Sequence, residues 1–308
     1  MTQQRTIPTR AWAELFLLGL IWGGSFLAIR LALDEVGFVT SVAHRVFWAA
    51  LILWGWVLWR GLTVPRNMRV WAAFLVMGLL NNVIPFSLMA WGQLYIETGL
   101  TAVFNAATAI FAVLVAAMIL PDERLSARKA TGVTLGFLGV AVAIGAESFR
   151  NFDVRSLAQL AVVAGTLSYA FASVWARLRL SELAPEVAAA GMLTGSTLVM
   201  VPAAFVIDGV PSADLSWKAI SAIAYFVVFA TAGAYLLYYR ILARAGAANT
   251  MLVTLIIPPV SIIAGAVALG EALSANVFAG LGLLALGLLL IDGRLFARRI
   301  KARTRPAD

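Results

Sequence analysis

Neutral hydrogen-bonding side chains recur near the middle of long apolar segments of this 308-residue sequence. Asn81 and Asn82 are adjacent in one such segment, and each amide offers two donors and two acceptor lone pairs. In the next segment, Asn105 and Thr108 are three residues apart and therefore share one face of a helix. Such side chains bind a solute by hydrogen bonds without fixed charge. The residues that we expect to line a binding cavity are Trp22, Ser25, Asn81, Asn82, Asn105, Thr108, Ser168, Tyr169, Thr231, Thr254 and Pro258.

Prolines near these polar residues support the same expectation. Pro85 follows the two asparagines, and Pro258 follows Thr254. A proline removes one helix hydrogen bond and frees the carbonyl four residues earlier. Within a membrane, such freed groups are tolerated mainly where they line a polar cavity or find a partner. Each Ser or Thr alone is explained by a bond to its own helix, so it is the convergence of both halves of the chain that favours a cavity.

Three ionisable side chains, Glu14, His44 and Arg45, are expected inside apolar segments, where an ionised group is a candidate for function. Glu14 is about one helical turn from the start of its segment, close enough to reach interfacial water, which favours a structural role. Arg45 is deeper. Its guanidinium either binds a substrate carboxylate bidentately or pairs with Asp34 or Glu35, and the sequence leaves both open. For His44, the single histidine, a packing role is favoured over proton transfer.

The composition is that of a membrane protein. Hydrophobic residues make up 62% and charged residues only 12% of the chain, about half the charged fraction of a soluble domain. The absence of cysteine excludes disulfides, a thiolate metal site and a thiol nucleophile. No acid pair, histidine cluster or activated nucleophile is expected at one depth, so we predict no catalytic residue, metal or cofactor. The net charge of +8 comes from short basic clusters between apolar segments, which does not indicate nucleic-acid binding.

An all-α integral membrane protein with ten transmembrane helices is the predicted fold class. Apolar segments of about 20 residues suffice to cross the hydrocarbon core, and short turn-forming linkers separate them. The predicted spans are residues 11–33, 41–60, 70–93, 98–120, 126–146, 156–178, 185–207, 217–242, 247–269 and 274–292.

The distribution of Lys and Arg orients these spans. Eighteen basic residues lie at the ends that share a side with the N-terminus, and five lie at or near the other ends. We therefore expect both termini in the cytoplasm of a multi-pass protein of the plasma (inner) membrane. The first apolar segment has no small-residue cleavage site and is expected to be a retained span.

The sequence also repeats itself. Glu123 begins a Glu-x-Leu-Ser element followed by Gly132 and Gly139, and Glu271 begins a second element followed by Gly280 and Gly287. Each unit contains five spans, and an odd number reverses the direction in which the second unit enters the membrane. Inverted repeats of this kind are typical of transporters. We therefore predict two inverted five-helix repeats, residues 1–150 (spans one to five) and 151–308 (spans six to ten).

Aromatic and glycine residues are predicted to have different roles by depth. Tyr235, Tyr238 and Tyr239 lie near the cytoplasmic end of the eighth span and are expected in an interfacial belt, as are most tryptophans. Trp22, Tyr169 and Trp175 are nearer the middle, where a ring beside a cavity suits an apolar or aromatic substrate. Close helix packing, rather than binding, is expected of Gly132, Gly136, Gly139, Gly280, Gly282 and Gly287.

Taken together, these features resemble the drug/metabolite transporter superfamily, specifically its EamA family. The matching elements are the stretch from Trp22 to Arg30, the arginine Arg45 of the second span, and the Gly270-Glu271 that opens the second Glu-x-Leu-Ser element. The resemblance is to bacterial amino-acid and metabolite exporters of that family. It implies ten spans in two repeats, and a monomer, since one chain holds both halves that small multidrug relatives obtain by dimerising. Those relatives carry a proton-binding glutamate where this chain has Trp22, so their proton chemistry is not implied.

We expect a transporter that exports small metabolites, most simply neutral or aromatic amino acids, by alternating access through a central cavity. The expected partners are a small-molecule substrate and the lipid bilayer. Efflux of lipophilic drugs is the alternative within transport, and it would favour the aromatic residues over the asparagines. An intramembrane enzyme is less favoured, and a receptor or channel would leave the inverted repeat unexplained.

Overall fold

The computed structural model describes residues 9–121, 123, 125–146, 153–212, 214–245, 250 and 253–292. These residues form helices joined by turns, without a β-strand among them. Nine helical segments are long and apolar enough to cross a membrane, and a tenth, α14, is shorter within the described part. The segments are α1 (Thr9–Ala32), α2 (Phe38–Trp59), α3-η1-α4 (Met68–Gly78, Leu79–Val83, Ile84–Gly92), α5-α6 (Thr98–Ala106, Thr108–Ile119), α7 (Ala127–Ile144), α9 (Val154–Arg179), α10 (Pro185–Ile207), α11-η2-α12 (Trp217–Ala224, Tyr225–Gly233, Ala234–Ala245), α14 (Val253–Leu269) and α15 (Ala275–Asp292).

The ten spans predicted from the sequence match these segments to within a few residues at the described ends. Local chemistry explains several of the boundaries. The Ser126 hydroxyl accepts a hydrogen bond from Lys129 N and begins α7, Asp153 accepts from Ser156 N and begins α9, and Pro185 occupies the first turn of α10. Such side chains satisfy backbone donors that lack a partner inside the helix, and proline has no donor to satisfy.

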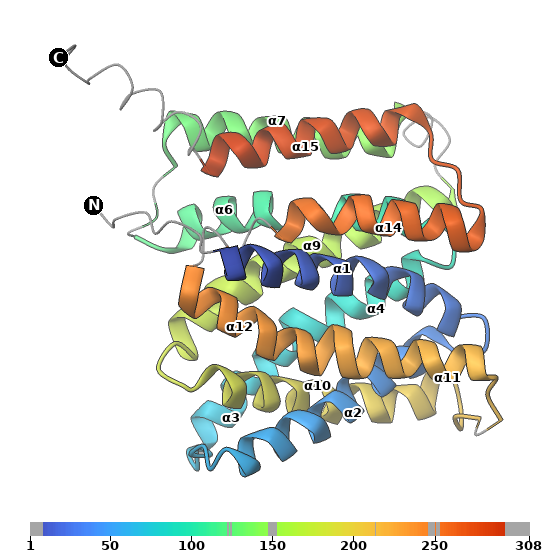
Figure 1. The fold of residues 1–308 in the computed structure, drawn as a ribbon. Helices are drawn as coiled ribbons and strands as arrows, with labels where there is room; N and C mark the ends of the chain where they lie inside the picture. Colours follow the sequence, from blue (N-terminus) through green and yellow to red (C-terminus); the bar gives the residue numbers. More distant parts are fainter. Residues whose placement is uncertain are drawn as a thin grey trace.

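Helices at equivalent places in the two halves pack against each other in antiparallel pairs. Near the start of α2, Thr40 N donates to Asp208 Oδ2 (2.7 Å) just after the end of α10. Further along, Trp54 Nε1 of α2 donates to Thr194 Oγ1 of α10 (2.8 Å). Figure 1 shows α7 and α15, the second such pair, side by side along one edge of the bundle, with α2 and α10 near the opposite edge.

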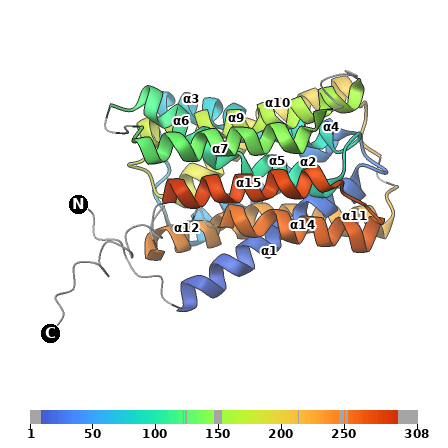
Figure 2. The same ribbon diagram turned by 90° about the horizontal axis from the view of Figure 1, so that it is seen from above.

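Glycines allow α7 and α15 to approach at backbone distance. A Cβ atom added to Gly139 would lie 2.8 Å from the Gly280 carbonyl oxygen, and one added to Gly132 would lie 2.7 Å from that of Gly287. These contacts confirm the predicted packing role of the repeated glycines. Gly282 is an exception, because nothing lies within 4 Å of the Cβ position there. The view from above in Figure 2 shows the two helices running alongside each other.

Between these two edges, the remaining helices form two groups. In the first group α1 packs against α14 and α11-η2-α12, and in the second group α9 packs against α5-α6 and η1-α4. The two groups are equivalent: α1, α14 and α11-η2-α12 of the first group correspond to α9, α5-α6 and α3-η1-α4 of the second. Each group therefore contains helices from both halves of the sequence.

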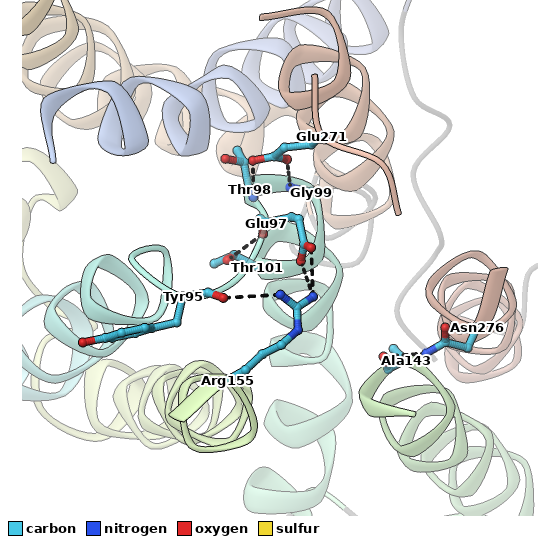
Figure 3. A network of polar contacts seen from close by, with 9 residues as sticks. All are labelled: Tyr95, Glu97, Thr98, Gly99, Thr101, Ala143, Arg155, Glu271 and Asn276. Atoms are coloured by element: carbon cyan, nitrogen blue, oxygen red, sulfur yellow. Dashed lines mark hydrogen bonds and ion pairs between the residues drawn. The ribbon is translucent and has the colours of Figure 1, made fainter. Parts of the chain in front are cut away.

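Polar contacts join the two groups at the end of the bundle where α14 ends, which we call the Glu271 end (Figure 3). Gly270 has a φ of +68°, a conformation that favours glycine. The next side chain, Glu271, accepts hydrogen bonds from Thr98 N (2.8 Å) and Gly99 N (3.2 Å) at the start of α5. A carboxylate at a helix N-terminus is favourable because unpaired N–H groups point toward it. The Glu-x-Leu-Ser element thus ties the first group to the second.

Candidate functional site

The helices that surround the centre of the bundle are irregular at mid-length. Segments α3-η1-α4 and α11-η2-α12 occupy equivalent places in the two halves, and each contains a π-helix, a form often found at functional sites. Side chains satisfy carbonyls at these irregularities: Ser168 Oγ donates to Leu80 O (2.7 Å), and Thr231 Oγ1 donates to Phe226 O (2.7 Å). The fourth span is interrupted at Ala107, between α5 and α6. The two π-helices and the interruption at Ala107 therefore all lie in the middle part of their spans.

A cavity of about 480 Å³ lies at this depth between the two groups of helices. Its volume is within the roughly 300–1,000 Å³ typical of small-molecule sites. Side chains from every described span except α7 and α15 contribute to its wall. Eight residues that the sequence nominated for binding lie on it: Trp22, Ser25, Arg45, Asn81, Asn105, Thr108, Tyr169 and Thr254.

Four nominated residues do not line the cavity, so that part of the prediction is wrong. Asn82 is fully buried, and its Nδ2 donates to Ser196 Oγ of α10 (2.8 Å). Ser168 and Thr231 are used by the π-helix carbonyls described above. Pro258 is buried within α14, whose cavity-facing positions are Val253, Thr254 and Ile257.

Three tyrosines that the sequence assigned to an interfacial belt instead line the cavity: Tyr235, Tyr238 and Tyr239. The Tyr235 hydroxyl donates to Asn82 Oδ1 (3.3 Å) and accepts from Asn81 Nδ2 (3.3 Å), which joins α12 to η1. Their spacing of three and four residues places Tyr235 with Tyr238 and Tyr239 on one side of a helix. This spacing could have predicted that the three tyrosines share one helix face. Their position near the end of the span suggested a membrane interface instead.

Trp22 and Tyr169 both line the cavity. The Trp22 indole Nε1 donates to Ala230 O (3.1 Å), and its ring lies 5.8 Å from that of Tyr238 between centroids. Trp175, the third ring expected there, donates its Nε1 to Ala73 O (3.0 Å) and does not line the cavity. Thr108 Oγ1 is buried without a hydrogen-bond partner among the described residues, and Asn105 lies about one turn before it on the same wall. The Asn105 amide can serve a ligand, and the Thr108 hydroxyl can do so once it turns toward the cavity.

Arg45 is the only Asp, Glu, Lys, Arg or His side chain on the cavity wall in the described part of the chain. It is 9% exposed, its Nε donates to Thr231 Oγ1 (2.9 Å), and its Cζ lies 3.9 Å from the centre of the Phe86 ring. No carboxylate of the described residues forms an ion pair with it. Neutral groups therefore hold the guanidinium in place, and its charge is not balanced by a described side chain.

The alternative partners proposed for Arg45 are occupied elsewhere. Asp34 pairs with Arg30 (2.7 Å) and Lys218 (2.8 Å) at the Glu271 end. Glu35 accepts hydrogen bonds from the hydroxyl and the backbone N–H of Ser216. Of the two readings of Arg45 left open by the sequence, the pairing with these acids is wrong.

Glu14 differs from the expectation that its carboxylate reaches water. It is 8% exposed, and its Oε1 lies 2.6 Å from Arg244 Nη1 and 3.4 Å from Arg240 Nε of α12. Arg10 Nε is 3.7 Å away on the preceding turn. Glu14 thus joins α1 to α12 through an ionic cluster outside the cavity, and this packing supports the structural role that the sequence favoured.

Comparison with known proteins identifies the fold and the family. The EamA-like transporter family matches this chain twice, over residues 11–145 and residues 156–292. A solved crystal structure superposes with a TM-score of 0.68 at 21% identity, covering 95% of this chain and 99% of the other. At this identity the likeness concerns the fold alone.

Relatives match along nearly their whole length. An "Uncharacterized transporter" of Archaeoglobus fulgidus is 26% identical over 290 residues, covering 92% of this chain and 98% of the relative. A "Probable terminal-alkyne amino-acid exporter" of Streptantibioticus cattleyicolor is 26% identical over 293 residues, covering 95% and 96%. "Protein PagO" of Salmonella typhimurium is 24% identical over 294 residues, covering 95% of each chain.

Proposed function

We propose that this chain, which belongs to the EamA-like transporter family, exports small carboxylate-bearing metabolites, most simply neutral or aromatic amino acids. The chain is a multi-pass membrane transporter, and the cavity is where we place its substrate. The observation that carries this proposal is Arg45, a buried cation on a wall whose other described side chains are neutral polar, aromatic and aliphatic.

The chemistry of the wall suits an amino acid. A guanidinium binds a carboxylate through two parallel hydrogen bonds. Thr108 Oγ1 lacks a partner among the described residues, and the Trp22 and Tyr238 rings provide an apolar surface. A relative named as an amino-acid exporter supports the same substrate class. Because a buried charge is costly when unbalanced, a substrate that brings the missing negative charge gains binding energy from relieving that cost.

For the mechanism, we propose alternating access between the two helix groups. Residues 1–150 and 151–308 would act as inverted repeats, with both termini in the cytoplasm and Glu271 at the outer face. The antiparallel packing of α2 with α10 and of α7 with α15 supports this arrangement. In transporters built from inverted repeats, the two halves or bundles rock around a fixed site near the midplane.

Efflux of lipophilic drugs is the second candidate function, and the Trp22–Tyr238 contact is the observation in its favour. Cationic drugs fit the cavity less well, because Arg45 would repel them and no described acid on the wall would attract them. The match to a transporter family favours transport over catalysis in the membrane.

The proposal is tested by flux into liposomes that contain the purified protein, measured for each of the twenty amino acids. We expect uptake of neutral and aromatic amino acids above that of empty liposomes, and Thr108→Val should reduce it. Thr131→Val is the matched control, because Thr131 is exposed and bonds only to Ala127 O of its own helix. Transport of lipophilic cations without transport of any amino acid would contradict the proposal.

A further inference from the structure

The cavity carries one fixed positive charge and no fixed negative charge among its described lining residues. Three acids of the described chain make their contacts outside the cavity: Glu14 with arginines, Asp34 with Arg30 and Lys218, and Glu271 with the start of α5. A zwitterion in this cavity therefore meets a full opposite charge at its carboxylate only.

The guanidinium of Arg45 is arranged for a ligand. Its Nε donates to Thr231 Oγ1, and its Cζ lies 3.9 Å from the centre of the Phe86 ring. Neither terminal Nη nitrogen makes a hydrogen bond with a described residue. These nitrogens carry the remaining donors of a planar fork, whose geometry matches the two oxygens of a carboxylate.

An ammonium group has no equivalent site. The groups available to it are hydroxyl and amide oxygens, such as those of Thr108 and Asn105, and the faces of aromatic rings. Near Arg45 it also meets a like charge, and a repulsion of this kind is stronger in a cavity of low dielectric than in water. The ammonium of an amino acid is thus tolerated rather than selected.

We propose that the carboxylate is the obligatory group of the substrate and that the ammonium is dispensable. Resting on the proposed function, this inference widens the substrate class from amino acids to small monocarboxylates with an apolar or aromatic body. Deaminated or otherwise amine-free acids are bound at Arg45 as amino acids are, and decarboxylated amines are not.

Three ligands that differ by one charged group test this inference: phenylalanine, 3-phenylpropionate and phenethylamine. Binding of each to the purified full-length protein in detergent is measured by calorimetry at pH 7. We expect 3-phenylpropionate to bind at least as tightly as phenylalanine. Phenethylamine should bind about ten- to a hundredfold more weakly, the factor that corresponds to one or two hydrogen bonds with a charged group. Leucine, 4-methylpentanoate and isopentylamine repeat the comparison with an aliphatic body.

The Arg45→Gln variant assigns the preference to its residue. We expect it to lower binding of both carboxylates to the level of the amine, while phenethylamine binding is unchanged or improved. The comparison of the three ligands on the unaltered protein stands even if the variant does not fold.

The possible outcomes separate the inference from the proposed function. Binding of phenylalanine without binding of 3-phenylpropionate overturns the inference and leaves the proposed function intact. A preference for phenethylamine, or no binding of any of the six ligands at millimolar concentration, overturns both. Carboxylate preference that persists in Arg45→Gln overturns the assignment to this arginine.

Discussion

Glu14 and Arg45 are the two charged side chains that are buried among the described helices, at 8% and 9% exposure. Glu14 has three arginines around its carboxylate, the nearest at 2.6 Å. Arg45 has a threonine hydroxyl and an aromatic ring. A buried charge that the protein balances holds helices together, whereas one that the protein leaves unbalanced is stabilised by a ligand of opposite sign. A similar difference exists between two neutral amides. Asn82 donates to Ser196 and accepts from Tyr235, whereas Asn105 lies on the cavity wall, where a ligand can reach it.

The largest effect is expected when Arg45 is given an internal partner, which would make it resemble Glu14. In Thr231→Asp the new carboxylate lies beside Arg45 Nε and competes with the substrate. We expect binding of 3-phenylpropionate to fall about a hundredfold or more, since two charge-assisted hydrogen bonds are lost. Thr231→Asn is the neutral control of the same size, and its binding should stay within about tenfold of wild type on the same scale. Equal binding by both variants would show that the substrate does not use Arg45.

The two asparagines provide a second test of the same distinction. Asn105→Ala should weaken apparent substrate affinity by about tenfold, the effect of one hydrogen bond, without lowering stability. Asn82→Ala should instead lower the free energy of unfolding by about 1–3 kcal/mol, because Ser196 Oγ and the Tyr235 hydroxyl lose a buried partner. Transport at matched membrane expression and thermal unfolding in detergent distinguish the two. If Asn82→Ala is stable and Asn105→Ala transports normally, the division between the asparagines is wrong.

Removing the balanced charge should leave substrate selection unchanged. Glu14→Gln is expected to lower the free energy of unfolding by about 1–2 kcal/mol, between the values for exposed and for fully buried ion pairs. The reason is that Arg240 and Arg244 are half-exposed and can regain water. Arg10→Gln is the control, because Arg10 is 76% exposed and 3.7 Å from the carboxylate. A strong loss of carboxylate binding in Glu14→Gln, with normal stability, would give Glu14 a role in transport.

The smallest effect concerns the exposed charges of the Glu271 end. A hydrogen bond from Lys218, together with the Arg30 guanidinium, lowers the pKa of the Asp34 carboxyl from its ordinary 3.8. A lowered pKa in the folded state means that the contribution to stability is present above pH 3.8 and is lost as the pH falls through the lower, folded pKa. Asp34→Asn should therefore remove a small part of the acid sensitivity of unfolding, since exposed pairs are screened by water. Thermal unfolding from pH 6 to pH 3 measures it, and identical curves would exclude the contribution.

Much of the fold was predictable from the sequence because hydrophobicity is a local property. The free energy of placing a segment in hydrocarbon is a sum over its own residues, so the spans from Thr9–Ala32 to Ala275–Asp292 could be placed without knowing their neighbours. The glycines of α7 and α15 were also recognisable, because close backbone approach requires a missing side chain wherever the helices cross.

The direction in which each polar side chain points could not be predicted in the same way. A π-helix adds a residue to a turn and rotates the residues after it, so a regular helical period does not apply through Leu79–Val83 or Tyr225–Gly233. Adjacent Asn81 and Asn82 have different surroundings, one on the cavity wall and one bonded to α10. Tyr235, Tyr238 and Tyr239 likewise enter the cavity although their depth suggested a membrane interface.

Local sequence patterns predict which segments are long and apolar enough to span the membrane, that the chain contains two related halves, and that charge within the spans is scarce. Which buried charge is balanced depends on how the helices pack. An ion pair depends on residues far apart in the chain, such as Glu14 and Arg244, meeting within a few ångströms. Whether Arg45 faced Asp34, Glu35 or a substrate was therefore fixed by the packing of helices from both halves, which no local pattern of residues contains.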